Sequence, residues 1–150
     1  MQSSRREFLA LIGLSLMTPR VSAVEPRSRA HYLSARAGAD GDWFVSGFDV
    51  EGAVAFDLPI PGRGHAVTAC PSRPEAVLVA RRPGDFLAII DLELGRLDRL
   101  VRAAPERHFC GHGVYARDGR LFYTSENDFA RGRGAIGVRD ALDGYRQVAE

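Results

Sequence analysis

Short apolar runs separated by turn-forming residues are the main pattern of the chain after residue 60. The runs occupy residues 65–70, 76–80, 86–92 and 97–101. Pro, Gly, Ser, Arg or Asp interrupt them at 71–74 and 82–85, and Leu-Gly-Arg does so at 94–96. No segment after residue 60 has the 3.6-residue period of an amphipathic helix. The pattern therefore predicts four short β-strands that form one antiparallel sheet.

This pattern recurs along the chain. Gly-His-Ala-Val at 64–67 returns as Gly-His-Gly-Val at 111–114, and the segment 87–91 has counterparts at 135–140 and at 43–49. A repeat of 40 to 50 residues with four strands is typical of β-propeller blades. We therefore expect an all-β fold, a β-propeller of four-stranded antiparallel blades of the YVTN or WD-repeat kind.

At about 47 residues a blade, the chain holds about two and a half blades. The first blade starts at its second strand, residues 31–35, and lacks a first strand. Because a propeller closes with four to eight blades, we expect residues 24–150 to be the N-terminal part of a longer propeller domain.

Residues 1–23 have the pattern of an export signal. Ser-Arg-Arg-Glu-Phe-Leu at 4–9 leads into an apolar stretch, and small residues follow at 21–23. Paired arginines in this place are typical of a twin-arginine signal, although an ordinary secretory signal can also contain them. The apolar stretch covers about 15 Å of a hydrocarbon core of about 30 Å. We expect export of the folded protein to the periplasm, with no stable membrane anchor after signal cleavage.

The charged residues exclude several classes of function. All 20 basic residues are Arg, so there is no lysine for a Schiff base or a phosphate-binding loop. Basic and acidic residues nearly balance, 20 against 19, and we therefore expect no nucleic-acid partner. Dinucleotide-binding and serine-hydrolase motifs are also missing from the sequence.

Several stretches resemble one bacterial family. They are Pro-Gly-Arg-Gly-His at 61–65, Gly-His-Gly-Val at 111–114, Leu-Phe-Tyr-Thr-Ser-Glu-Asn-Asp-Phe at 121–129 and Gly-Arg-Gly-Ala-Ile-Gly-Val at 132–138. They resemble an uncharacterised family of twin-arginine-exported β-propeller proteins, often encoded with imelysin-type periplasmic iron-uptake proteins. The resemblance implies a periplasmic propeller longer than this chain, with iron-uptake proteins as partners. It provides no catalytic residue that could be carried over and leaves the cofactor unknown, and Cys110 stands where a Tyr-like residue is expected.

A propeller's geometry predicts where polar residues gather. The first strand of each blade lines the channel, and it starts at the end where the second and third strands are joined. Seven side chains would then surround one channel mouth and bind a ligand or partner: His65, Arg81, Arg82, His112, Glu126, Asn127 and Asp128. We expect the last three in a loop. The alternative is structural, with Gly-His pairs holding turns between blades and rim charges pairing with each other.

A second candidate is a metal site. His108, Cys110 and His112 have the i, i+2, i+4 spacing that places side chains on one face of a strand. Imidazole and thiolate suit copper, zinc or ferrous iron, although this spacing also arises by chance. The repeat places Cys70 and Cys110 about 23 Å apart, too far for a disulfide.

Two functions remain open at this point. The sequence favours a binding module for a ligand or a protein, and the family resemblance implies a role in iron acquisition. The alternative is a propeller enzyme of the lactonase or quinoprotein-dehydrogenase type, with its site at the channel mouth. An enzyme would gather titratable groups with strongly shifted pKa values there.

We do not expect the arginines of the Arg-Gly-Arg-Gly segment at 131–134 to form a nucleic-acid site. Arg131 and Arg133 are expected to pair with Glu126 and Asp128 rather than with nucleic acid.

Overall fold

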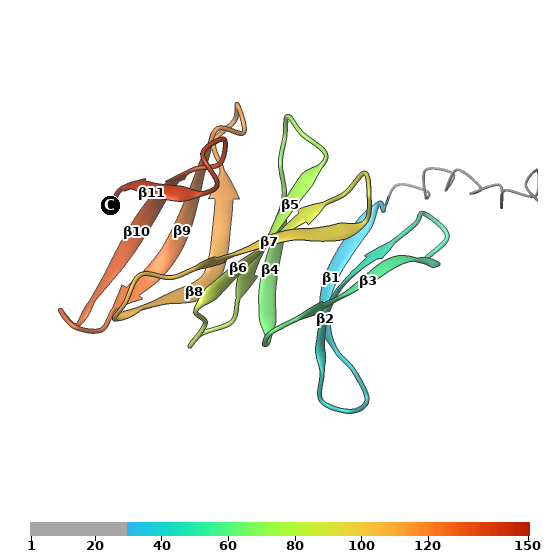
Figure 1. Cartoon of the computed structure of the whole chain (residues 1–150), viewed down its shortest axis with the longest axis horizontal. Helices are drawn as coiled ribbons and strands as arrows, with labels where there is room; N and C mark the ends of the chain where they lie inside the picture. Colours follow the sequence, from blue (N-terminus) through green and yellow to red (C-terminus); the bar gives the residue numbers. More distant parts are fainter. Residues whose placement is uncertain (1–29) are drawn as a thin grey trace, which may run out of the picture.

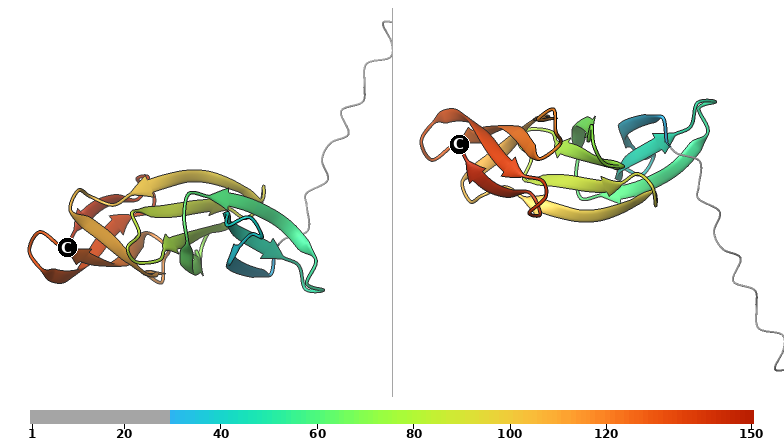
Figure 2. Two further views of the ribbon diagram at one scale, coloured as in Figure 1. Left: turned by 90° about the horizontal axis from the view of Figure 1, so that it is seen from below. Right: turned by 90° about the horizontal axis from the view of Figure 1, so that it is seen from above.

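A computed structural model describes residues 30–150, which form an all-β fold of eleven strands. The strands make three antiparallel sheets that follow one another along the long axis of the molecule (Figures 1 and 2). Within residues 30–150, no helix is long and apolar enough to cross a membrane. The signal peptide expected at residues 1–23 lies outside the described residues.

Each sheet is built from strands that are consecutive in sequence. The first contains β1 (Tyr32–Ala37), β2 (Trp43–Phe48) and β3 (Val54–Ile60). The second contains β4 (Gly64–Ala69), β5 (Glu75–Ala80), β6 (Phe86–Asp91) and β7 (Arg96–Arg102). The third contains β8 (Arg107–Tyr115), β9 (Leu121–Asp128), β10 (Arg133–Asp140) and β11 (Arg146–Ala149). This order confirms the predicted four-stranded antiparallel blades, and within residues 30–150 the first sheet has three strands.

The middle sheet is buried on both faces because it lies between the other two. Val77 and Val79 of β5 belong to the core shared with the third sheet, whereas Leu78 belongs to the core shared with the first. Successive side chains of a strand point to opposite faces, so a strand covered on both sides is an unbroken apolar run. Each fully buried Val or Leu contributes about 1.5–3 kcal/mol relative to an exposed one.

The first strands of the two complete sheets lie side by side. β4 contacts β8 and, on its other side, β1. The Thr68 hydroxyl of β4 donates a hydrogen bond of 2.8 Å to the Gly113 carbonyl of β8. In a propeller these are the strands that line the central channel.

The strands of the third sheet extend further than the sequence predicts. β9 continues to Asp128, so Glu126, Asn127 and Asp128 pair with β8 and β10 instead of forming a loop. The expectation of a loop at these positions is wrong. The residues of β9 alternate between buried and half-buried, and the buried Glu126 forms ion pairs with arginines on the two neighbouring strands. Such pairing allows charged residues to lie inside a sheet face.

The hairpin between β8 and β9 turns at Asp118 and Gly119, a dipeptide that favours tight hairpin turns. Gly119 has a φ of +75°, which L-residues rarely adopt, and Asp118 precedes it. The Ala116 amide donates to the Leu121 carbonyl at 2.8 Å and so closes the hairpin.

Candidate functional site

The two Gly-His segments of the repeat bring two imidazoles together. His65 lies on β4 and His112 on β8, and both side chains are exposed. Their ring centroids are 4.9 Å apart and the ring planes meet at 85°. This placement agrees with the prediction that the two histidines gather on the channel-lining strands. Two accessible imidazoles at this distance can accept hydrogen bonds or bind a metal ion together.

The local shape of β8 makes this histidine pair possible. The register of β8 against β9 shifts between Phe109 and Gly113, which forms a β-bulge. Gly111, inside the bulge, has a φ of +93° and packs against the His65 ring. A Cβ at position 111 would lie 2.6 Å from the His65 Cδ2 atom. The sequence alone did not indicate this role of Gly111.

The same bulge separates the three residues of the predicted metal site. The regular alternation that would align His108, Cys110 and His112 is lost where the register shifts. The His108 ring packs on Phe129 instead, at a centroid distance of 4.7 Å. In residues 30–150, no three His, Cys, Asp or Glu side chains lie close enough to hold a metal ion. His108, Cys110 and His112 therefore do not form a three-residue metal site in this part of the chain.

Both cysteines are free thiols. Cys70 is buried and Cys110 is half-buried. The Cys70 thiol lies 3.9 Å from the Gly119 carbonyl at the β8–β9 turn. Cys70 therefore belongs to the contact between the second and third sheets, far along β4 from His65.

Arg81 and Arg82 lie where the sequence predicts, in the loop between β5 and β6. Both are exposed. The Arg81 amide donates to the Arg63 carbonyl at 2.8 Å, which ties this loop to the residues before β4. The two arginines therefore lie at the end of the blades where the strand carrying His65 begins.

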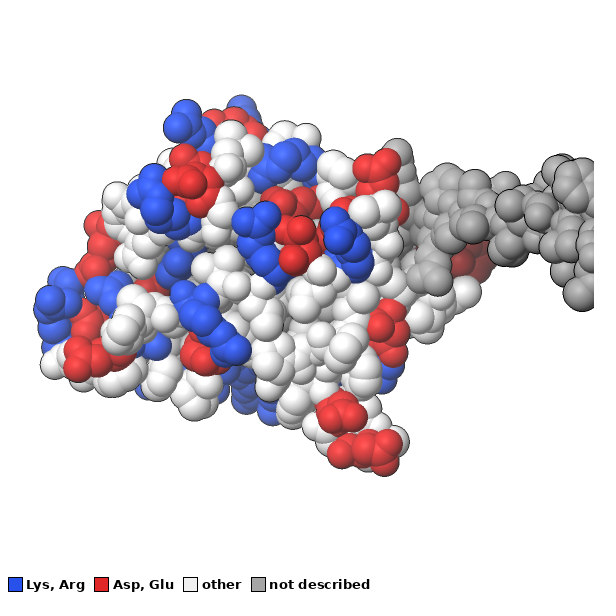
Figure 3. All heavy atoms as spheres, in the orientation of Figure 1, with Lys and Arg blue, Asp and Glu red and all other residues white. Residues whose placement is uncertain are grey.

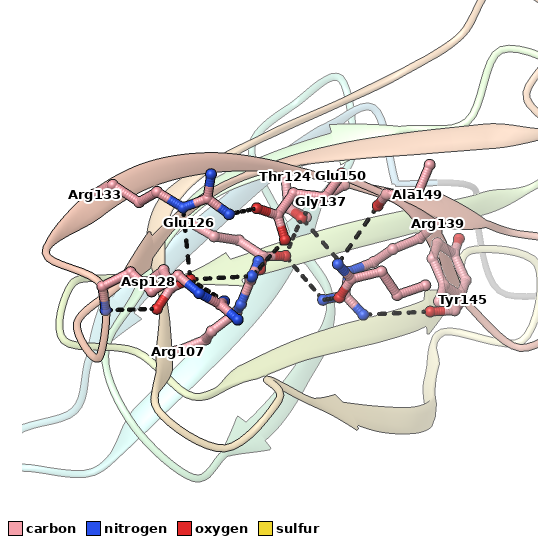
Figure 4. Close-up of polar contacts among 12 residues, drawn as sticks. Arg107, Thr124, Glu126, Asp128, Arg133, Gly137, Arg139, Tyr145, Ala149 and Glu150 are labelled. Atoms are coloured by element: carbon pink, nitrogen blue, oxygen red, sulfur yellow. Dashed lines mark hydrogen bonds and ion pairs between the residues drawn. The ribbon is translucent and has the colours of Figure 1, made fainter.

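Figure 4 shows a charged cluster on one face of the third sheet. The core residue Phe122 lies on the same face. The members of the cluster are Arg107, Thr124, Glu126, Asp128, Arg131, Arg133, Arg139 and Glu150. Four arginines and three acids thus share one side of a sheet. The members of the cluster belong to the third sheet, to its β9–β10 loop and, for Glu150, to the position after β11, and the pair of Glu126 and Arg139 at its centre is buried.

Glu126 lies at the centre of the charged cluster. Its side chain is fully buried, and it accepts hydrogen bonds from Arg139 at 2.9 Å, Arg107 at 3.3 Å and the Thr124 hydroxyl at 2.7 Å. The Arg139 guanidinium also lies 5.1 Å from the centroid of the Phe109 ring. A buried carboxylate of this kind is tolerated because several donors replace its water.

Asp128 lies at the edge of the charged cluster. It accepts hydrogen bonds from the Arg131 guanidinium at 2.8 Å and from the Arg131 amide at 3.1 Å, and Arg133 lies 3.8 Å away. The hydrogen bond from the Arg131 side chain lowers the pKa of Asp128 below its usual value. Arg107 and Arg133 bind Glu150, and Arg107 lowers the pKa of that carboxyl. The predicted pairing of Arg131 and Arg133 with an acid is confirmed at Asp128.

The predicted set of seven mouth residues is thus divided by the structure. Glu126 and Asp128 are each 2% exposed and have their carboxylates occupied by arginines. Asn127 lies between them on β9, half-buried on the opposite face, opposite His108 in register. The exposed members are the four cationic or imidazole residues, His65, Arg81, Arg82 and His112.

The most strongly shifted pKa values belong to two tyrosines at the other end of the blades. Burial raises the pKa of Tyr115 and of Tyr145 far above the usual value. The Tyr145 hydroxyl donates to Glu75 at 2.6 Å and contacts the Tyr115 hydroxyl. Because Glu75 begins β5 and Arg81 follows its end, these groups are distant from the histidine pair.

Comparisons with known proteins agree with this architecture. Thirty-six chains of solved structures match. One is the structure titled "Dihydro-heme d1 dehydrogenase NirN in complex with DHE", with a TM-score of 0.60 and 21% sequence identity. The match covers 78% of this chain and 27% of that one, so this chain spans about a quarter of its length. The likeness shows the fold, which is that of a β-propeller.

Two further comparisons use the sequence alone. No curated protein matches the chain. A family model described as "Protein of unknown function (DUF1513)" matches residues 58–150, which include both complete blades. Since this match covers more than half of the sequence, the chain belongs to the DUF1513 family.

Proposed function

We propose that this chain is part of a periplasmic β-propeller that binds iron for an iron-acquisition system, with His65 and His112 in the binding site. The observation that carries the proposal is the exposed pair of imidazoles on adjacent inner strands, with ring centroids 4.9 Å apart. Imidazole nitrogen is a good ligand for ferrous iron. Two ligands leave coordination positions open for other parts of the full-length propeller or for a chelator.

The glycine beside the pair supports a role that is more than structural. Gly111 has left-handed backbone geometry, and the His65 ring fills the space where its side chain would be. Glycine thus allows the backbone of β8 to approach the His65 ring closely while both imidazoles stay exposed. A side chain at position 111 would displace the His65 ring, so the glycine maintains the geometry of the imidazole pair.

The experiment is a titration of the purified full-length protein with Fe(II) under anaerobic conditions. The double variant His65→Ala/His112→Ala should bind Fe(II) roughly tenfold more weakly or worse. The matched control is His108→Ala. His108 lies on the same strand as His112, but its ring packs on Phe129 and not on His65. Absence of saturable binding by the wild type, or equal affinities for all three proteins, would contradict the proposal.

The proposed partner is an imelysin-type periplasmic iron-uptake protein. Family resemblance supports this choice, because such proteins are often encoded together. Biolayer interferometry between the two purified full-length proteins, with and without Fe(II), measures the interaction. No binding at micromolar concentrations in either state would rule this partner out.

The proposed periplasmic location is tested through the signal. The paired arginines of the twin-arginine pattern are Arg5 and Arg6. The variant Arg5→Lys/Arg6→Lys should leave the protein in the cytoplasmic fraction, because the export receptor reads the arginines themselves. Unchanged export of this variant would point to the ordinary secretory route.

A further inference from the structure

A few arginines of the described chain have no acidic partner. Most of the arginines in residues 30–150 form ion pairs with Asp or Glu, in agreement with the nearly balanced charge. Those in this range that form no ion pair are Arg63, Arg81, Arg82 and Arg117. The first three lie together at one end of the middle sheet. This grouping leaves an uncompensated positive charge at one place.

The three arginines line one pocket. It has a volume of about 470 Å³ and is formed by residues 61–63, before β4, and 80–86, around the β5–β6 loop. The hydrogen bond from the Arg81 amide to the Arg63 carbonyl holds the two segments together. Arg63 is also positioned by Trp43, whose ring centroid is 5.6 Å from the guanidinium carbon. Basic side chains are also visible at the lower edge of the molecule, below the middle sheet (Figure 3).

The acid in this pocket does not neutralise the arginines. Asp85 is part of the lining, but Arg102 donates a hydrogen bond of 2.7 Å to its carboxylate. Three cations near one another repel, and the repulsion is relieved when an anion binds between them. The balance of charge in the pocket therefore favours an anionic ligand.

The chemistry of guanidinium defines that ligand further. Each guanidinium is planar and donates two parallel hydrogen bonds to a carboxylate or a phosphate. Three of them around one pocket fit a molecule that has more than one anionic group. The volume is sufficient for a small organic molecule together with water.

We propose that the arginine pocket, defined by Arg63, Arg81 and Arg82, is a binding site for a small di- or tricarboxylate. The site goes beyond the proposed iron binding and rests on different residues. Loss of Fe(II) binding at the histidine pair and loss of carboxylate binding at this pocket are therefore separate results.

The probe is citrate, added to the full-length protein in a calorimetric titration at about 50 mM ionic strength, where screening is moderate. The variant Arg81→Gln/Arg82→Gln removes two charges and keeps long polar side chains. It should bind citrate roughly tenfold more weakly or worse. The control is Arg117→Gln, which removes an exposed, unpaired arginine from the β8–β9 turn at the other end of the blades.

Three outcomes would overturn the proposal. They are the absence of saturable citrate binding by the wild type, equal affinity of the two variants, and tighter binding of phosphate or acetate than of citrate. Both substituted arginines are exposed, so the melting temperatures of the variants should stay near that of the wild type. The variant Arg81→Lys/Arg82→Lys keeps the charge and loses the paired hydrogen bonds. It should bind citrate with intermediate affinity, and full loss or full retention would contradict recognition by guanidinium geometry.

Discussion

Gly137 of β10 lies directly against the carboxylate of Glu126 on β9. A Cβ at position 137 would overlap the Glu126 Oε1 atom and would lie 2.7 Å from the Thr124 hydroxyl. The absence of a side chain on one strand thus creates the space for a buried carboxylate on the next (Figure 4). This relationship couples a glycine to the charged cluster.

The first prediction follows from this contact. The substitution Gly137→Ala should displace the Glu126 carboxylate from its hydrogen-bonding position and lower the free energy of unfolding by about 1–3 kcal/mol. The control is Gly134→Ala on the same strand, where a Cβ would meet only the Glu126 carbonyl oxygen, at 4.0 Å. Urea unfolding of the full-length protein measures both. Similar unfolding midpoints for the two variants would show that the glycine does not support the carboxylate.

The second prediction concerns the charges of the cluster. Glu126→Ala should lower the free energy of unfolding by about 3–5 kcal/mol, because it leaves Arg139 buried without its carboxylate. The side chain of Arg139 is only 4% exposed. Glu93→Ala, in the exposed β6–β7 turn, should change stability by less than about 0.5 kcal/mol. If Glu126→Ala unfolds at the same urea concentration as Glu93→Ala, the carboxylate has no structural role.

The third prediction is a pH dependence caused by Asp128. The hydrogen bond and charge of Arg131 hold the pKa of this carboxyl below its ordinary value of 3.8 in the folded protein. Folding therefore favours the ionised form, and the resulting stability is present above the unfolded pKa and is lost as the pH falls through the folded one. The urea concentration at the unfolding midpoint is measured at pH values from 7 downward. In the wild type it should decrease once the pH is below about 4, and in Asp128→Asn it should decrease less steeply.

The control for this pH dependence is Asp40→Asn. Asp40 is exposed in the β1–β2 turn and forms no ion pair with any described residue. Its substitution should leave the wild-type slope unchanged. Equal slopes for Asp128→Asn and the wild type would show that the Asp128–Arg131 contact does not form in solution.

The second blade was predictable from the sequence because its strands are apolar on both faces. The four predicted strands end within two residues of β4 to β7, since Pro, Gly and Asp interrupt each apolar run. The third blade was less predictable. The strands β8, β9 and β10 include charged residues such as Arg107 and Asp128, whose pairing depends on contacts between strands. A sequence pattern alone does not contain those contacts.

The candidate site shows the same limit. The repeat of Gly-His placed His65 and His112 on neighbouring first strands, and in the structure their ring centroids are 4.9 Å apart. The alternation rule failed at the next step, because the bulge at Gly111 shifts the register of the strand that carries His108. A bulge depends on backbone geometry, and Gly111 had an equally good explanation as part of a repeated turn.

The fourth prediction concerns the tyrosines that join the second and third sheets. Burial and, for Tyr145, the hydrogen bond to Glu75 favour the neutral phenol, so the pKa values of Tyr115 and Tyr145 are raised. The stability from this pair is present below the unfolded pKa of about 10 and is lost at higher pH. Absorbance at 295 nm, which reports tyrosinate, is measured against pH for the wild type and for Tyr115→Phe/Tyr145→Phe. The difference between the two curves should rise well above pH 10, or when the protein unfolds. A difference that rises near pH 10 would contradict the raised pKa values.

The fifth prediction separates two properties of Gly111, its left-handed backbone and its close packing against the His65 ring. In Gly111→Ala, a methyl group 2.6 Å from the His65 ring must displace that ring, and the left-handed backbone adds strain of about 1 kcal/mol. Gly41→Ala is the matched control, because Gly41 has a similar φ of +88° and no atom within 4 Å of a built Cβ. Both variants should lose similar stability from backbone strain.

Only Gly111→Ala should shift the NMR signals of the His65 and His112 rings, which are assigned through His65→Ala and His112→Ala. If the ring signals move equally in both variants, strain reaches the site through the backbone. If they move in neither, the rings do not pack on Gly111, and the histidine pair forms without the bulge.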